Sequence, residues 1–220
     1  MGNRFIRKLR PLVRVERALH FESGWLRSWW RSKPLDDAGE PLPSLTYPAI
    51  DFIAQFDLSE ASVFAWGNGL SSAWWSKRCR RITTVDPNIE GIPHIKPLLP
   101  SDLDSLSTSF HTSAEVEALL TRQLAVHDVI VIDNNGPLRW RCAEAATKHM
   151  ADGGMIILDN RDQCLKSSEV LRDAGLTEIN FSGIAANNAN LHTTSIFFPG
   201  WLKFRISDAP PSRHNPAAAN

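Results

Sequence analysis

Residues 63–86 have the sequence VFAWGNGLSSAWWSKRCRRITTVD. The stretch begins with a short apolar run of the kind found in buried strands. Its two glycines let the backbone turn sharply and let a ligand come close, because glycine carries no Cβ. The stretch therefore predicts, in order, a strand, a glycine turn, a helix, a second strand and a terminal acid: residues 63–66, 67–69, 71–80, 81–85 and Asp86.

Asp86 lies about 20 residues beyond the glycine turn, which is the spacing at which an acid binds ribose hydroxyls. A carboxylate at the tip of the second strand can accept hydrogen bonds from both hydroxyls of a sugar. The helix N-terminus beside the glycine turn favours an anionic group. The alternative is an ordinary tight turn between a strand and a helix in an α/β protein.

This stretch resembles the first two motifs of class I S-adenosylmethionine-dependent methyltransferases, and is similar to a bacterial subgroup with the pattern Gly-x-Gly-x-Ser-x-x-Trp-Trp. Ala65 stands where the family usually carries an acid, and Ser71 replaces the third glycine. The resemblance implies that the chain binds S-adenosylmethionine and that Asp86 holds its ribose. The cofactor-binding residues that it implies are Trp66, Gly67, Asn68, Gly69, Ser71, Asp86 and Asp133.

The second half of the chain predicts more of a parallel sheet and then a hairpin. Residues 127–133 contain a continuous Val/Ile run, which indicates a strand buried on both faces. A helix over 138–150, closed by residues 151–154, precedes a strand over 155–158, and a helix over 167–174 follows. Two strands joined by a short turn must be antiparallel, and the last such pair is 177–184 and 191–198, with the turn at 185–190.

These elements predict an α/β fold: a Rossmann-like methyltransferase fold with a mostly parallel sheet, an antiparallel C-terminal hairpin and helices on both faces. An ordinary nucleotide-binding sheet lacks such a hairpin. A strand over 93–99 and a helix over 113–125 are also expected. The predicted organisation is a basic, Trp-rich helical extension, a methyltransferase-like domain and a disordered tail: residues 1–45, 46–206 and 207–220.

Composition narrows the function classes. The chain has 220 residues, a net charge of zero and only three cysteines, which indicates a reducing compartment and a cytoplasmic location. Neutral charge disfavours a nucleic-acid substrate, and no apolar run is long enough to span a bilayer. The basic residues 1–19 form an amphipathic pattern. They either pack on the protein body or on a second copy, or rest at the surface of an anionic membrane.

Several polar residues are expected at the carboxyl ends of the strands, where ligands bind in an open parallel sheet. Asp133, Asp159 and His192 are the candidate catalytic bases for an acceptor that must lose a proton. Asp133, Asp159 and Asn160 offer hard oxygen ligands suited to Mg²⁺. Their spacing is similar to that of metal-dependent O-methyltransferases of the catechol type. The alternative is that these polar strand ends face solvent.

We therefore expect an S-adenosylmethionine-dependent methyltransferase that acts on a small-molecule or glycan-type acceptor by O-methylation. One rival is a non-catalytic binding or scaffold protein on the same fold, which the departures at Ala65 and Ser71 favour. A second rival is an NAD-type oxidoreductase. The glycine spacing after Gly69 and the terminal hairpin both argue against it.

Overall fold

The computed structural model describes residues 11, 13, 16–17, 23–66, 70–85, 125–133 and 139–207. Its elements in chain order are α2 Trp25–Arg31, α3 Tyr47–Ile53, β1 Ser62–Trp66, α4 Ser71–Ser76, β2 Arg81–Val85, β3 His127–Ile132, α7 Arg139–His149, β4 Met150–Leu158, the short 3₁₀ helix η4 Arg161–Gln163, α8 Leu165–Asp173, β5 Thr177–Ala185 and β6 Asn188–Phe198. The strand and helix predicted over 93–99 and 113–125 lie outside the described residues, apart from Ala125.

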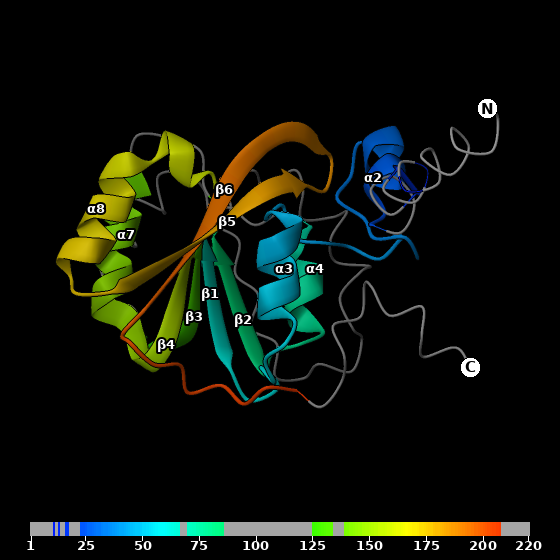
Figure 1. Cartoon of the computed structure of the whole chain (residues 1–220). Helices are drawn as coiled ribbons and strands as arrows, with labels where there is room; N and C mark the ends of the chain where they lie inside the picture. The colour runs from blue at the N-terminus through cyan, green and yellow to red at the C-terminus, as the bar shows by residue number, and fades with distance from the viewer. Residues whose placement is uncertain are drawn as a thin grey trace.

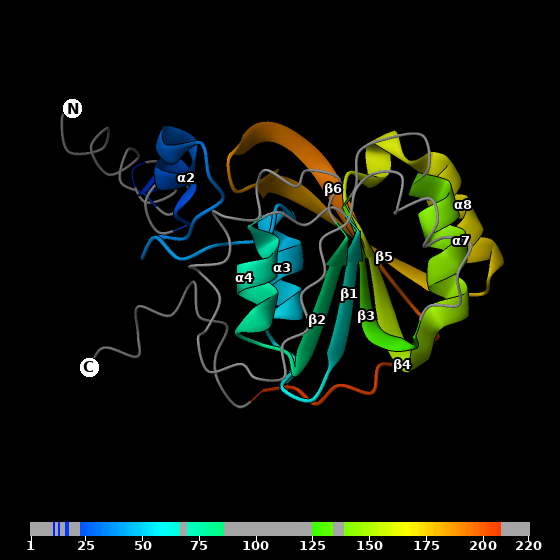
Figure 2. The same cartoon turned by 180° about the vertical axis from the view of Figure 1, so that it is seen from behind.

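One sheet organises the described part of the chain. Its strand order is β2-β1-β3-β4-β6-β5. The first four strands are parallel, whereas β6 runs antiparallel to β4 and to β5. Figures 1 and 2 show α3 and α4 on one side of this sheet and α7 and α8 on the other. The predicted mostly parallel sheet with a C-terminal antiparallel hairpin is confirmed.

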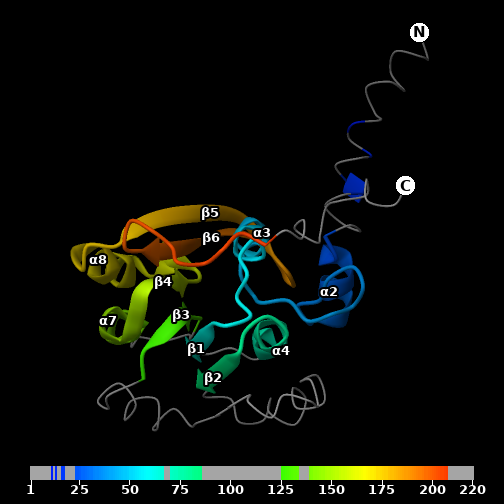
Figure 3. The same ribbon diagram turned by 90° about the horizontal axis from the view of Figure 1, so that it is seen from below.

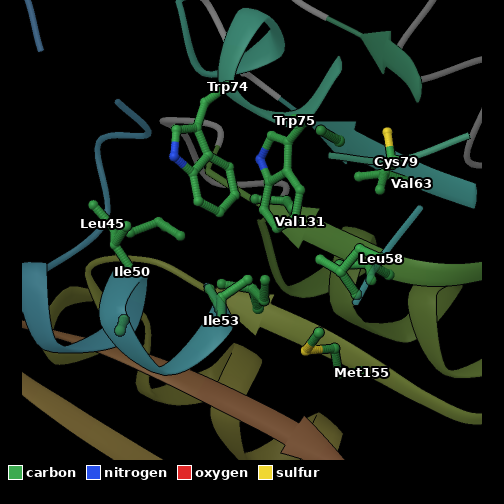
Figure 4. Close-up of a cluster of buried hydrophobic side chains, with 14 of the residues drawn as sticks. Leu45, Ile50, Ile53, Leu58, Val63, Trp74, Trp75, Cys79, Val131 and Met155 are labelled. Carbon is green, nitrogen blue, oxygen red and sulfur yellow. The ribbon is translucent and has the colours of Figure 1, made fainter. Parts of the chain in front are cut away.

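The alternation of side chains along β1 divides the core into two layers. Val63 and Ala65 belong to the cluster under α3 and α4, and Phe64 and Trp66 to the cluster under α7. Figure 4 shows Trp74 and Trp75 of α4 beside Ile50, Ile53 and Val131 in the first layer. Several tryptophans of this protein are therefore core residues rather than surface residues.

The structure corrects three local predictions. Helix α4 ends at Ser76, four residues before the predicted end. Residues 151–154 do not close a helix, because α7 ends at His149 and β4 begins at Met150. Residues 151–154 belong to β4 instead. The strand is irregular there: Gly153 has a φ of 66°, and the register between β4 and β3 shifts after His127. The hairpin turn is also shorter than predicted, with only Ala186 and Asn187 between β5 and β6.

Candidate active site

The strand order places a topological switch point between β1 and β3. From β1, the chain continues to β2 on one side and later returns to β3 on the other. Trp66 pairs with Val85 of β2 and with Ile132 of β3, so the carboxyl ends of these strands lie together. In open α/β sheets, ligands bind in the crevice outside this point.

Trp66 and Asp133 meet at the switch point. The backbone N–H of Asp133 donates to the carbonyl of Trp66 at 2.9 Å. The Trp66 side chain is fully buried, and its indole N–H has no acceptor among the described residues. A buried donor without a partner is costly, and this indole packs in the core cluster that also contains Phe64 and Val85. Ser71, the first residue of α4, is also buried. Residues 67–69 and Asp86, all predicted to bind the cofactor, lie outside the described residues.

Asp159 and His192 form a buried pair at the same edge of the sheet. Asp159 directly follows β4, and its N–H donates to the carbonyl of Ile132 at 3.1 Å. His192 lies on β6, opposite Gly183 of β5. Its Nε2 lies 3.6 Å from Oδ1 of Asp159, and the two side chains are 6% and 1% exposed. The structure thus brings together two residues that were predicted separately as catalytic candidates.

Two side-chain donors hold the Asp159 carboxylate. Thr194 Oγ1 donates to Oδ1 at 2.6 Å, and Asn160 Nδ2 donates to Oδ2 at 2.7 Å. The Thr194 hydroxyl in turn accepts from the N–H of Thr46 at 3.0 Å. Thr46 precedes helix α3, so this chain of contacts connects the helix start to the carboxylate that faces His192.

The charge state of His192 follows from these surroundings. The Asp159 carboxylate favours the protonated imidazole and raises the pKa of His192 above its usual value, against the lowering effect of burial. The carbonyl of Asn190, 3.3 Å from Nδ1, and the charge of Asp162 act in the same direction. The pair therefore suits a base that stabilises the proton it takes up.

The predicted Mg²⁺ site gains no support from this geometry. The two oxygens of Asp159 accept from protein donors, and Asn160 turns its amide nitrogen towards Asp159. Asp133 is half-buried at the end of the neighbouring strand. Within the described ranges, no group of three or more His, Cys, Asp or Glu side chains is placed to hold a metal ion.

Sequence reasoning missed three residues of this site. Thr46 and Thr194 complete the Asp159 network across 148 positions of sequence, and no local pattern links them. Arg139 is buried at the start of α7, and its Nη1 donates to the Asp159 carbonyl and to Cys164 Sγ, both at 2.9 Å. In the sequence, Arg139 lies in the first turn of the predicted helix over 138–150, where an arginine resembles an ordinary surface residue.

A cavity of about 370 Å³ lies at the opposite edge of the sheet, near the starts of β1 and β3. It is lined by Asp57, Ser59, Glu60, Ala61, Asp128, Lys203, Phe204 and Arg205. Asp128 accepts hydrogen bonds from Ser62 and pairs with Lys203. The carboxylate is thus part of the local scaffold, and the cavity is separate from the switch point.

Comparisons with known proteins identify the fold. No family model matches the chain, and no curated protein matches it. Among solved structures, the precorrin-6y C5,15-methyltransferase of Geobacter metallireducens is similar with a TM-score of 0.52 and 16% identity, over 69% of this chain and 87% of that one. The O-methyltransferase TomG of Streptomyces achromogenes, solved in complex with S-adenosylmethionine, is similar with a TM-score of 0.52 and 13% identity, over 82% and 88%.

An rRNA methylase of Streptococcus thermophilus is similar at a TM-score of 0.51 and 14% identity, over 70% of this chain and 95% of that one. These proteins have different acceptors, so the likeness concerns the shared architecture. It agrees with the strand order and the terminal hairpin described above. The chain has the Rossmann-like fold of class I S-adenosylmethionine-dependent methyltransferases.

Proposed function

We propose that this protein is an S-adenosylmethionine-dependent methyltransferase that O-methylates a small-molecule or glycan-type acceptor. The observation that carries the proposal is the buried His192–Asp159 pair at the carboxyl edge of a methyltransferase-type sheet. This pair would act on an acceptor bound beside the switch point, where the fold places its ligands. Neutral net charge favours small acceptors over nucleic acid.

The cofactor would lie over the turn at 67–69, next to Trp66 at the end of β1. Asp86 would bind the ribose of the cofactor. What supports this place is the switch point itself, where Trp66 ends β1 between β2 and β3. Asp133 follows β3 and is hydrogen-bonded to the backbone of Trp66, and Ser71 begins α4. When bound, S-adenosylmethionine supplies an activated methyl group for transfer to a nucleophile.

His192 would serve as the general base. A hydroxyl acceptor must lose its proton as its oxygen attacks, and the neutral imidazole of His192 would take up this proton at Nδ1, the ring nitrogen that does not face Asp159. The acceptor hydroxyl would replace the 3.3 Å contact between Nδ1 and the carbonyl of Asn190. Asp159 then stabilises the imidazolium, and Thr194 and Asn160 keep the carboxylate in place. Alignment of the two bound reactants supplies much of the remaining acceleration. We assign deprotonation to His192 rather than to Mg²⁺, because the Asp159 oxygens already accept from protein donors.

The rival function is a non-catalytic binding protein on the same fold. Ala65 favours this rival, since its fully buried methyl group stands where the family usually has a carboxylate. The affinity for the cofactor separates the two readings only in part, because a binding protein can also retain the cofactor. Turnover of an acceptor separates them completely.

The first test is calorimetric titration of the purified chain with S-adenosylmethionine, S-adenosylhomocysteine and NAD, with and without Mg²⁺. We expect micromolar binding of the first two ligands, no binding of NAD and no effect of Mg²⁺. Asp86→Ala should abolish binding, while Asp152→Ala, at an exposed position of β4, should leave it unchanged. Wild-type protein that binds neither sulfur compound would refute the enzyme assignment.

A further inference from the structure

Helix α2 and the two residues after it expose an unusual combination of side chains. Trp29 is 53% exposed and Trp30 is 79% exposed. Arg27, Arg31 and Lys33 are exposed around them. We call these five residues the Trp–Arg surface. Leaving two large aromatic rings in water is less favourable than burying them. A partner that covers this surface would remove that cost.

The helix that carries this surface is fixed to the protein. The indole N–H of Trp25 donates to the carbonyl of Asn188 at 3.0 Å, which attaches α2 to the tip of the β5–β6 hairpin. The buried Ser28 hydroxyl exchanges hydrogen bonds with the backbone of Leu35. Trp25 also stacks on Trp29, with ring centroids 6.4 Å apart. One face of α2 is therefore held, and the other presents Trp30 and the cations.

Charge is strongly segregated along this neutral chain. Residues 1–33 contain nine Lys and Arg residues but only two Glu, a net charge of +7, so residues 34–220 carry −7. Two of the three acids that follow α2 have local partners: Asp36 accepts from the N–H of Glu40, and Glu40 pairs with Lys77. Arg27, Arg31 and Lys33 remain exposed beside this turn, which also carries the exposed Asp37.

We propose that α2 docks the protein on an anionic membrane surface through the Trp–Arg surface. Tryptophan is favoured at the level of the lipid headgroups, because its ring is apolar and its N–H is polar. Lysine and arginine beside it are attracted by anionic headgroups. Exposed aromatics and cations on one short, fixed helix match this chemistry. Among the helices that the structure describes, none has the length and apolar composition that spanning a bilayer requires.

Docking of this kind would also orient the candidate active site. Figures 1 to 3 show α2 on the side of the molecule away from α7 and α8. The hairpin tip that Trp25 contacts is at the carboxyl edge of the sheet, where β5 ends. A membrane held by α2 would therefore lie close to the edge that carries Asp159 and His192.

The test is co-sedimentation of the full chain with two vesicles, one of phosphatidylcholine and one with 30% phosphatidylserine. We expect binding to the anionic vesicles only, and a loss of binding as salt is raised from 0.1 to 0.5 M. The double variant Arg27→Ala/Arg31→Ala should weaken binding to the anionic vesicles about 25-fold, because the loss of each cation should weaken it about fivefold. Trp29→Ala/Trp30→Ala should weaken it by roughly 10-fold or more.

Two variants serve as matched controls. Trp201 is 52% exposed but lies near Gly153 at the other edge of the sheet, and Lys148 is an exposed cation of α7. Trp201→Ala and Lys148→Ala should bind as the wild type does. Unfolding midpoints within about 2 °C of the wild type ensure that the variants are folded.

Three results would overturn the proposal. The first is that both double variants bind anionic vesicles as well as the wild type does. The others are wild-type binding to neutral vesicles that equals binding to anionic ones, and losses of binding in the two control variants that equal those in the double variants. Displacement of the vesicles by single-stranded RNA of matched charge concentration would assign the surface to nucleic acid instead. The assay contains no cofactor, so its failure leaves the methyltransferase proposal intact, and a failed cofactor titration leaves membrane docking intact.

Discussion

Nε2 of His192 lies 3.6 Å from Oδ1 of Asp159, although the two residues come from strands of opposite direction. The register of β4 and β6 pairs Leu158 with Ser195. That register places Thr194 beside Asp159, where its hydroxyl donates to the same carboxylate oxygen at 2.6 Å. The terminal hairpin therefore completes the candidate site rather than only extending the sheet.

His192→Gln should reduce methyl transfer by about 100-fold or more, because it removes the base that takes the acceptor's proton. Affinity for S-adenosylmethionine should stay within about twofold of the wild type. The measurement is S-adenosylhomocysteine formation at a saturating hydroxyl acceptor. His149→Gln, at the end of α7, is the matched control and should keep full activity. Equal rates in His192→Gln and wild type would remove His192 from the mechanism.

Activity should rise with pH through the pKa of His192, since only the neutral imidazole accepts a proton. Asp159 raises that pKa above its usual value, so Asp159→Asn should move the inflection to lower pH. Titration of the His192 ring signals by NMR gives the same shift without an acceptor. An inflection that stays in place in Asp159→Asn would show that this carboxylate does not control the imidazole.

The same contact predicts how stability depends on pH. A pKa that is raised in the folded state stabilises the protein fully below the unfolded-state pKa of His192, and this contribution is lost as pH rises through the folded-state value. The difference in unfolding free energy between wild type and His192→Gln should therefore shrink as pH rises through that window. Urea unfolding at several pH values measures it.

Thr194→Val should destabilise the protein by about 1–3 kcal/mol, because it leaves the buried Asp159 oxygen without a donor and the Thr46 N–H without an acceptor. The control is Thr177→Val at an exposed position of β5, which should change the unfolding free energy by less than about 0.5 kcal/mol. Equal effects at the two positions would mean that the network adds nothing to stability.

The buried strands of the sheet could be predicted because runs of consecutive apolar residues in the sequence indicate them. Residues 129–132 and 155–158 are apolar at consecutive positions, as strands covered on both faces must be. Gly153 and Gly154 misled the prediction because a helix end and an irregular strand both use glycine. A Cβ on Gly154 would lie only 2.7 Å from the Asp128 carbonyl, and this constraint comes from β3, more than 20 residues away in the chain.

The candidate site was predicted as separate residues but not as an arrangement. Asp159 and His192 each stand out beside a strand end or turn, so both were candidates. Their contact depends on the register between β4 and β6, which no local pattern specifies. Thr46 and Thr194 were missed for the same reason, since their hydrogen bond links residues whose partners only the tertiary structure determines.

The tryptophans offer a direct test of the division between core and surface. Trp75 is fully buried on α4, and Figure 4 shows it beside Val131 of β3, so Trp75→Ala should cost about 3–5 kcal/mol of unfolding free energy. Trp30 is 79% exposed on α2, so Trp30→Ala should lower the unfolding free energy by less than about 0.5 kcal/mol. Chemical denaturation of both variants gives the two values. Similar losses would mean that Trp30 packs against the protein, which would also remove the basis for membrane docking by α2.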